Sequence, residues 1–338
     1  MILPLELTPS PLPSELFQAK VWDSLYSPSQ SSPETPFSTL QWQSLWWRHF
    51  GQEYRWSAFT IRENGRVIGI APFYWDPGTG FLKLIGGEDL SDYLDILAAK
   101  GRESQVWDQI LGYLESSPPE IRGLDLHCLP STSPALQVLP PLAEIRGYQV
   151  QCQAEDVCPT LELPGSWDAY LALLARKERH ELRRKMRKAE RASPPLRFRQ
   201  CKEEECARED IRSFICLHRK SQPEKQAFMD KQREAFFREA SDVFAKQGWL
   251  RLYILEREEK AVAAMLCFDY REALYLYNSG FDPQLSALSP GIVLIGYCLQ
   301  DAIARGKRWF DFLRGNEDYK YRLGGKDSPI FRMVVKRP

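Results

Sequence analysis

The sequence predicts an α/β fold, of the α+β type, made of two similar lobes. Its 338 residues are enough for two domains. The order hairpin, strand, helix, strand occurs twice along the chain, which indicates two lobes of the same kind. In both series the strand after the helix carries a single acid among apolar residues, namely Asp125 and Asp311.

The first predicted lobe covers residues 36–165 and follows an N-terminal arm, residues 1–35. The arm is rich in Pro and Ser, which predicts loop apart from a short helix near residues 13–25. Inside the lobe, Asn64-Gly65 separates two apolar runs, 56–61 and 67–74, and so predicts a β-hairpin. The other expected elements are a helix over 36–49 capped by Ser38, a strand over 93–97, a helix over 103–114 and a strand over 123–127.

The second predicted lobe covers residues 166–338. Ser166 is an expected N-cap for a basic helix that runs to residue 192, where Pro194-Pro195 follows. The remaining expected elements are a helical block over 203–244, a hairpin of 250–256 with 261–268, a strand over 273–278, a helix over 292–304, a strand over 309–313, a short helical segment after Gly315 and a final strand over 330–335.

Composition and charge exclude several classes of protein. Lys+Arg and Asp+Glu are equal at 45 each, so the global charge predicts no polyanionic partner, and we expect no DNA binding. The eight cysteines have no Cys-x-x-Cys pair or zinc-type spacing, which predicts free thiols and no metal site. The sequence has no signal-peptide pattern and no apolar run of about 20 residues. We therefore expect a cytoplasmic protein that does not span a membrane.

The C-terminal stretch FDFLRGNEDYKYRLGG, residues 310–325, combines an acid, a base and phenols beside an apolar strand. It resembles the signature of the CelD/BcsL-like acetyltransferases of the GNAT superfamily. More distantly, Tyr319-Lys320 with Leu323-Gly324-Gly325 resembles a turn of the Fem peptidyltransferases, which have tandem GNAT lobes. The resemblance implies two GNAT lobes, each a mixed, mostly antiparallel sheet flanked by helices and turning parallel around one crossover helix, with the first lobe degenerate.

A donor site is expected where the strand over 273–278 leads to the helix over 292–304. The resemblance implies that the edge of this strand receives the pantetheine amides of acetyl-CoA or another acyl-CoA. The exposed N–H groups and dipole of a helix N-terminus suit a pyrophosphate, and Pro is compatible with the first helical turn. The full glycine-rich loop of typical GNAT enzymes is absent. The expected cofactor-binding residues are Tyr277, Asn278, Ser289, Pro290, Gly291 and Ile292.

Lys320 is the first catalytic candidate, because its resemblance to the lysine of the Fem turn implies stabilisation of developing negative charge. The alternative is a surface ion pair with Glu317, three residues earlier on a helix. Acyl transfer to an amine also needs a proton acceptor, for which Asp311, Glu317 and His218 are candidates. Asp311 has the alternative role of capping a turn.

His218 lies in Leu217-His218-Arg219-Lys220, which resembles the family segment Leu-His-x-x-Arg-Trp. Here Ser221 follows Lys220, where the family has Arg-Trp. The resemblance implies a site role for His218, and a structural histidine on a helix is the alternative.

The helix over 166–192 has an apolar stripe and a strongly basic opposite face. It resembles the Arg-rich helix of the family and a basic helix of Fem enzymes, which lies beside the substrate cleft. Arg binds phosphate through two parallel hydrogen bonds, whereas a solvated face is the alternative. The expected substrate-binding residues are Arg183, Arg184, Arg187, Arg314, Tyr319 and Tyr321.

The sequence therefore favours an acyl-CoA-dependent N- or O-acyltransferase, acting by direct transfer. Its expected acceptor is an amino sugar, a nucleotide-linked sugar or a surface-polysaccharide precursor. One alternative is a Fem-like transferase that takes its donor from aminoacyl-tRNA. Another is a non-catalytic binding protein on the same fold.

Overall fold

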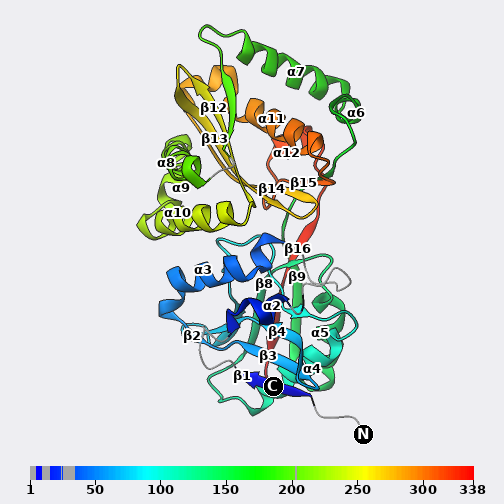
Figure 1. Cartoon of the computed structure of the whole chain (residues 1–338). Helices are drawn as coiled ribbons and strands as arrows, with labels where there is room; N and C mark the ends of the chain where they lie inside the picture. Colours follow the sequence, from blue (N-terminus) through cyan, green and yellow to red (C-terminus); the bar gives the residue numbers. More distant parts are fainter. Residues whose placement is uncertain (1–4, 10–15, 24, 26–34, 202–203) are drawn as a thin grey trace. The chain divides into compact units, whose positions relative to one another are not determined.

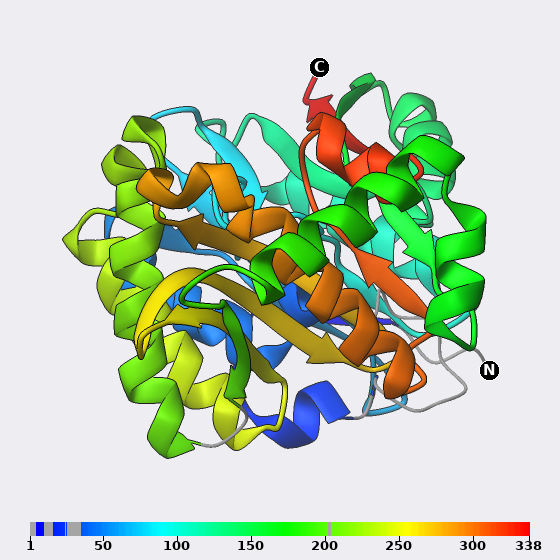
Figure 2. The ribbon, with the colours of Figure 1, turned by 90° about the horizontal axis from the view of Figure 1, so that it is seen from above.

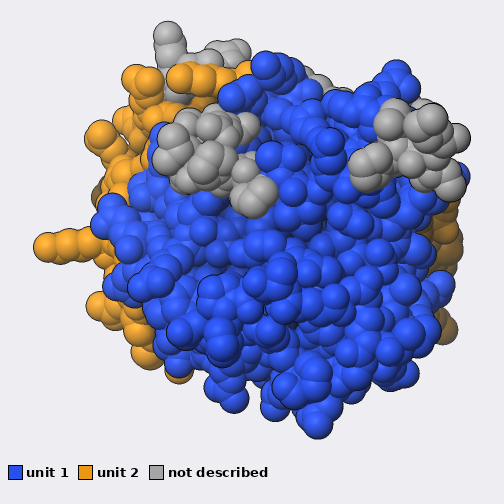
Figure 3. All heavy atoms as spheres, turned by 90° about the horizontal axis from the view of Figure 1, so that it is seen from below, with its two compact units in different colours: residues 1–156, 328–338 blue, residues 157–327 orange. Residues whose placement is uncertain are grey.

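The computed structural model describes residues 5–9, 16–23, 25, 35–201 and 204–338 (Figure 1). The chain divides into two compact units, coloured in Figure 3. Unit 1 comprises residues 1–156 and 328–338, and unit 2 comprises residues 157–327. This division differs from the lobes expected at 36–165 and 166–338, because the C-terminal residues 328–338 return to unit 1.

Two sheets form unit 1 within the described residues. The four-stranded sheet has the order β1-β3-β4-β7, and the six-stranded sheet has the order β2-β5-β6-β8-β16-β9. In the larger sheet β6 and β8 are parallel neighbours. The strands are β1 (Glu6–Pro9), β2 (Arg55–Trp56), β3 (Phe59–Glu63), β4 (Arg66–Ala71), β5 (Phe73–Asp76), β6 (Phe81–Leu84), β7 (Leu97–Ala98), β8 (Gly123–Pro130), β9 (Gln149–Val157) and β16 (Pro329–Lys336).

The helices of unit 1 pack apolar faces against these sheets. In α4, the stripe Val106, Trp107, Ile110, Leu111 and Leu114 is buried, as the helical spacing predicts. The helices are α2 (Ala19–Asp23), α3 (Leu40–Phe50), α4 (Glu103–Ser116) and α5 (Ala135–Ile145).

Several predicted elements of unit 1 are confirmed and others are not. The Asn64-Gly65 hairpin is present as β3 and β4. The cap of α3 is Thr39, whose Oγ1 accepts from the Trp42 N–H at 3.3 Å, and not Ser38. The strand expected over 93–97 is wrong except at its end, because Tyr93–Asp95 is buried but irregular and only Leu97–Ala98 pairs. Part of the expected helix at 13–25 lies outside the described residues.

Unit 2 is built on one six-stranded sheet, with the order β10-β15-β14-β13-β12-β11 among the described residues. All of its pairings are antiparallel except β14 with β15. The predicted hairpin is present as β12 and β13. The strands are β10 (Thr160–Glu162), β11 (Arg197–Cys201), β12 (Leu250–Arg257), β13 (Lys260–Tyr270), β14 (Ala273–Phe281) and β15 (Trp309–Asp311).

Helices cover both faces of this sheet (Figure 1). The helices α8 (Glu204–Ser221), α9 (Pro223–Phe228) and α10 (Lys231–Lys246) lie on one face. On the other face lie α6 (Trp167–Leu173), α7 (Arg176–Glu190) and α11 (Pro290–Ala304), and α12 (Asp318–Arg322) follows β15.

The basic helix expected from 166 to 192 is interrupted. Ser166 caps α6 as predicted, accepting from the Ala169 N–H at 3.2 Å. Leu174 and Ala175 then adopt extended backbone, and a second helix, α7, begins at Arg176. The break places Leu174 in the core together with Leu171 of α6 and Leu182 of α7.

Six described cysteines are not part of a disulfide: Cys128, Cys152, Cys158, Cys216, Cys267 and Cys298. Cys201, at the end of β11, is disulfide-bonded, so the prediction of free thiols is wrong there. The absence of a Cys-x-x-Cys pair does not exclude a disulfide, because a disulfide requires only that two cysteines meet in space. Among the described helices, none is long and apolar enough to cross a membrane.

Candidate active site

The two parallel strands of unit 2 separate after three paired residues. Ala273–Tyr275 of β14 pairs with Trp309–Asp311 of β15. Strand β15 ends at Asp311, whereas β14 continues to Phe281 with only β13 as its recorded partner. Beyond Tyr275, the second edge of β14 therefore has no strand partner among the described residues. Such an edge presents backbone N–H and C=O groups that an extended amide-bearing ligand can bond.

A β-bulge lies at the point where β14 leaves β15. Leu266 pairs with Asn278 and the next residue, Cys267, pairs with Leu276, so Tyr277 is the extra residue. A bulge bends its strand and re-aims the neighbouring side chains. Tyr277 stacks on Phe268 with ring centroids 4.9 Å apart. Two of the predicted donor-site residues, Tyr277 and Asn278, thus occupy the bend in the strand.

The N-terminus of α11 follows the end of β14 through the short 3-10 helix Pro283–Leu288. Ser289 adopts a left-handed backbone (φ 52°), and Pro290 opens the helix as predicted. No acid lies in the first turn of α11, where the N–H groups of Gly291 and Ile292 have no carbonyl four residues earlier within the helix. A Cβ on Gly291 would meet only the ring of Phe281, at 3.8 Å, so the space beside this residue is open.

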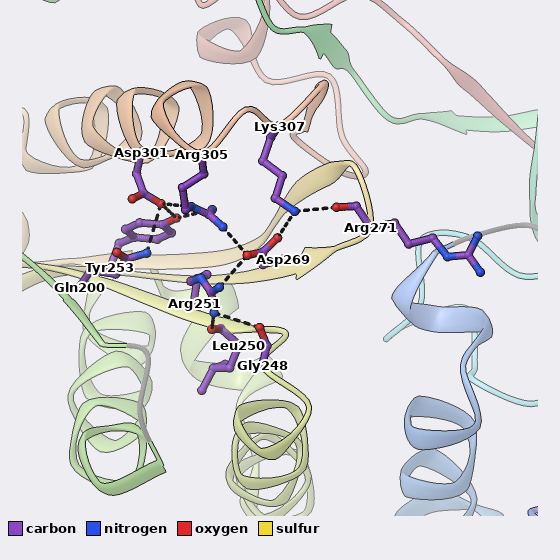
Figure 4. Close-up of polar contacts among 10 residues, drawn as sticks. All are labelled: Gln200, Gly248, Leu250, Arg251, Tyr253, Asp269, Arg271, Asp301, Arg305 and Lys307. Carbon is purple, nitrogen blue, oxygen red and sulfur yellow. Dashed lines mark hydrogen bonds and ion pairs between the residues drawn. The ribbon is translucent and has the colours of Figure 1, made fainter. Parts of the chain in front are cut away.

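A network of charged side chains fixes the other end of α11 to the sheet (Figure 4). Asp301 accepts from the Tyr253 hydroxyl at 2.7 Å and from Arg305 at 2.8 Å. Asp269 of β13 receives Arg305 and Lys307, together with Arg251 at 2.7 Å. This network contacts no predicted donor-site residue. Its consequence for the site is that the direction of α11, and with it the position of Gly291, is held by the strands.

Helix α7 supports α11 from its outer side (Figure 2). Gly296 lets the two helices approach, since a Cβ there would lie 3.0 Å from the Met186 sulfur and 3.4 Å from Leu182. Lys188 of α7 donates to the Ala287 carbonyl at 2.8 Å, close to the start of α11.

The turn after β15 is held by Asp311 and Lys320. The Asp311 carboxylate accepts from the Leu313 N–H at 2.8 Å, which stabilises the left-handed backbone of Leu313 (φ 56°). The Lys320 ammonium donates to the carbonyls of Leu313, Arg314 and Gly315 at 2.8, 2.7 and 3.0 Å. It also lies 2.9 Å from a Glu317 oxygen, the partner given to it in the alternative to a catalytic role.

Lys320 is not a surface lysine, because its side chain is 2% exposed. Three carbonyls and one carboxylate occupy the donors of a group that has three N–H bonds. In this conformation Lys320 shapes the turn at residues 313–315 and has no donor left for a substrate carbonyl. Its predicted catalytic role stays a prediction.

His218 lies at the C-terminal end of α8, facing the bulge in β14. The His218 ring is 1% exposed, shares a hydrogen bond with the Asn278 side chain and contacts Phe214 and Phe228. Burial, and after it the charge of Lys225, lowers the pKa of His218 to about 4. Its Nδ1 has no partner in the described part of the structure. His218 is therefore a neutral imidazole at neutral pH.

Lys225 of α9, which is not among the residues predicted from the sequence, lies beside the same part of β14. Its Nζ donates to the Ser279 carbonyl at 2.6 Å, two residues beyond the bulge. Burial lowers the pKa of Lys225 to about 8, whereas Glu317 acts in the opposite direction. Only the Gln222-Pro223 break between α8 and α9 marks this segment in the sequence, and nothing local predicts that Lys225 turns inward.

The structure therefore brings together part of the predicted site. Tyr277, Asn278 and His218 are close in space, and Glu317 with Lys320 closes the turn after β15. Arg314 is half-buried, with its carbonyl bound to Lys320. Burial raises the pKa of the Tyr319 phenol, and the Tyr321 hydroxyl donates to Asp327 at 2.7 Å. The predicted substrate-binding roles of both tyrosines stay predictions.

Three of the predicted substrate-binding arginines, Arg183, Arg184 and Arg187, are on the exposed side of α7, whose buried residues are Leu182, Met186 and Ala189. Arg184 forms two hydrogen bonds with Glu181, both of 2.8 Å. Arg183 lies 3.7 Å from Asp168 and is half exposed. Arg187 donates to the Arg183 carbonyl at 3.3 Å. None of these contacts links the arginines to β14.

Unit 1 has a different arrangement at its own parallel pair, β6 and β8. His127 of β8 lies 2.8 Å from both Glu88 and Glu155 and 3.2 Å from Asp125. Arg332 of β16 binds Asp125 with two hydrogen bonds of 2.8 and 2.9 Å. Burial favours neutral His127, but its hydrogen bonds to the three carboxylates raise its pKa to about 10. This cluster is fully paired and leaves no free ring nitrogen.

Among the described residues, no group of three His, Cys, Asp or Glu side chains is arranged to hold a metal ion. Two features of unit 2 expose backbone groups. They are the free edge of β14 and the first turn of α11, whose N–H groups suit an anion.

Comparisons with known proteins bear on the domain type and on the fold. Residues 176–321 match the family model of the acetyltransferase (GNAT) domain. No curated protein matches the sequence.

Solved structures share the fold of the whole chain. The structure of FemX has a TM-score of 0.63 at 10% identity, covering 97% of this chain and 96% of FemX. L-PGS from Bacillus licheniformis has a TM-score of 0.56 at 11% identity, covering 96% and 92%. A tandem GNAT protein from the clavulanic acid biosynthesis pathway has a TM-score of 0.52 at 13% identity, covering 99% of both chains. At these identities the likeness shows the fold alone.

Residues 176–321 thus match the acetyltransferase (GNAT) domain, the protein is an acyltransferase, and its fold agrees with that of tandem GNAT proteins.

Proposed function

We propose that this protein is an acyl-CoA-dependent N- or O-acyltransferase of the CelD/BcsL-like kind, with its donor site in unit 2. The proposed acceptor is an amino sugar, a nucleotide-linked sugar or a surface-polysaccharide precursor in the cytoplasm. The acceptor amine or hydroxyl attacks the thioester directly, without a covalent enzyme intermediate.

One observation carries this proposal. Strand β14 continues from its bulge at Tyr277 to Phe281 without β15 beside it, and α11 begins shortly afterwards with Pro290-Gly291. The thioester of the donor would lie near the bulge, the pantetheine along the free strand edge and the pyrophosphate at the helix N-terminus. The bulge, the free edge of β14 and the N-terminus of α11 follow one another in that order within residues 176–321.

A thermal-shift titration with CoA, acetyl-CoA and longer acyl-CoAs tests the donor site. A ligand that binds only the folded protein raises its apparent stability, by about 2.7 kcal/mol at 100 times Kd. The Gly291→Glu variant adds a carboxylate at the helix N-terminus, where it repels a pyrophosphate, and we expect it to lose the shift.

Gly291→Ala is the matched control, because the open space beside Gly291 accepts a methyl group. It should keep the shift. Absence of a shift with every CoA in the unmodified protein would contradict the proposal.

A Fem-like transferase that uses aminoacyl-tRNA is the second candidate, supported by the exposed basic face of α7. Binding of tRNA through this face would release counterions and weaken steeply with salt. Filter binding of bulk tRNA at low and at near-physiological salt, with an Arg183→Ser, Arg187→Ser double variant, tests it. Salt-sensitive binding that the variant reduces, together with no CoA shift, would favour this candidate.

A further inference from the structure

Lys225 is placed where an acyl group would react in the proposed donor site. It comes from α9, a short helix that Pro223 begins after the break at Gln222. Its Nζ donates to the Ser279 carbonyl at 2.6 Å, and the Ser279 hydroxyl lies at 3.5 Å. Ser279 follows Asn278 directly beyond the bulge. The lysine thus reaches the segment of β14 that lies beyond β15.

The groups that face Lys225 come from several elements. Glu317, at the start of α12, acts on its charge, and Lys225 in turn acts on His218 of α8. On β14, the Asn278 side chain accepts a hydrogen bond from the Ser279 N–H at 2.9 Å and shares another with His218. Within the described part of the chain, Lys225 forms no ion pair with Glu317. The ammonium therefore has one strong hydrogen bond there and keeps donors for a further partner.

The other titratable groups nearby are less suited to accept a proton from a substrate. Asp311 is buried and bound to the Leu313 N–H. Lys320 is occupied by three carbonyls and Glu317. His218 is enclosed by Phe214, Phe228 and Asn278. Lys225 is partly exposed, and burial lowers its pKa to about 8, so that roughly a tenth of it is neutral at pH 7 and half at pH 8.

We propose that Lys225 is the catalytic base that takes the proton of the attacking acceptor during acyl transfer. The acceptor nitrogen or oxygen forms a bond to the thioester carbonyl carbon, and its proton passes to neutral Nζ. The C–S bond then breaks, its electron pair leaves with sulfur, and the CoA thiolate is protonated from solvent. The resulting ammonium of Lys225 returns its proton to solvent. This inference rests on the proposed acyl-CoA-dependent function.

A first experiment needs no acceptor. Lysines of the full-length protein are labelled with acetic anhydride from mildly acidic to alkaline pH, with and without desulfo-CoA, and quantified by mass spectrometry. We expect Lys225 labelling to follow a pKa of about 8, and saturating desulfo-CoA to reduce it by roughly fivefold or more. Lys231, an exposed lysine on α10, should show no protection.

The variants separate a base from a structural cation. With acetyl-CoA and an amino-sugar acceptor found by screening, Lys225→Met and Lys225→Arg should both lower kcat by about 100-fold or more, since Arg cannot lose its proton. The KM for acetyl-CoA should change much less than kcat. The unmodified enzyme should lose activity as the pH falls below about 8, whereas Lys231→Met should behave like it.

Two results would overturn the inference. One is a CoA-induced thermal shift without any protection of Lys225 from labelling. The other is a Lys225→Arg variant with normal turnover, which would mean that only the positive charge matters. Failure of the proposed function gives a different result, namely no thermal shift with CoA in the unmodified protein.

Discussion

Each unit has a parallel strand pair joined by a crossover helix, β6 with β8 in unit 1 and β14 with β15 in unit 2, and the segments that follow these pairs differ. In unit 1, β6 ends at Leu84, soon after its pairing with β8, and α4 begins at Glu103 with Arg102 before it. In unit 2, β14 continues to Phe281, and α11 begins at Pro290-Gly291 without an acid. An acid in the first turn of a helix opposes an anion there.

The turns after the parallel strands also differ. In unit 1, His127 lies beyond the residues where β6 and β8 pair, and it forms ion pairs with Glu88, Asp125 and Glu155. In unit 2 the turn depends on Lys320, whose ion-pair partner is exposed Glu317. The same strand–helix–strand order can thus end in a charge-saturated cluster or in a free strand edge. Only the second suits an anionic, amide-bearing donor.

Replacing Lys320 should have the largest effect. Lys320→Met leaves three carbonyls at the turn without their donor, which should lower the free energy of unfolding by about 3–5 kcal/mol. Urea unfolding measures this loss, with Lys326→Met at an exposed position as the control. A Lys320→Met protein that is fully stable but inactive would instead assign Lys320 to catalysis.

The His127 cluster should make the stability of unit 1 depend on pH. The folded-state pKa of about 10 is above the unfolded value of 6.5. The stabilisation from protonated His127 is therefore complete below about pH 6.5 and is lost as the pH rises through about 10. Each pKa unit is worth about 1.4 kcal/mol. Because its partner Glu88 is about half exposed and therefore screened by solvent, we expect a loss on the order of 3 kcal/mol.

The His127→Gln variant provides the reference for this measurement, because Gln hydrogen-bonds without titrating. The stability difference between the two proteins should shrink steadily from pH 6.5 to about 10 in urea unfolding. A constant difference over this range would show that His127 is neutral in the folded state.

Asp311→Asn should have the smallest effect. The Asn oxygen still accepts from the Leu313 N–H, so the turn is kept and the free energy of unfolding should change by less than about 1 kcal/mol. Turnover should also change little, because Lys225 is the proposed base. A loss of turnover of about 100-fold with unchanged stability would make Asp311 the base. Asp311 would then differ in role from Asp125, the corresponding acid of unit 1, which binds Arg332 and His127.

Local signals in the sequence were sufficient for much of the fold. Asn64-Gly65, Ser166 and Pro290 each require a particular backbone conformation, and all three predict the element that the structure has. Helix α5 was missed because Pro140 and Pro141 lie inside it, where proline ordinarily breaks a helix.

Long-range placement could not be predicted in this way. The final strand was expected correctly, but its partner is β8, from a distant part of the chain. Lys320 was singled out as exposed or catalytic, whereas its burial depends on the carbonyls of a turn that only the folded chain forms. Lys225 has an ordinary sequence context, and its low pKa arises from tertiary burial.

The pairing of β16 with β8 has a consequence for synthesis of the protein. A Cβ on Gly123 would lie 1.9 Å from the Val335 carbonyl oxygen, so β8 is built to receive this strand closely. On the ribosome, all of residues 157–327 are made before β16 exists. Unit 2 can therefore fold while unit 1 still lacks a strand from the interior of its sheet. Translation of unit 1 thus begins first, but its sheet is completed last. Until β16 has been synthesised, the edge of β8 that it pairs with is unpaired.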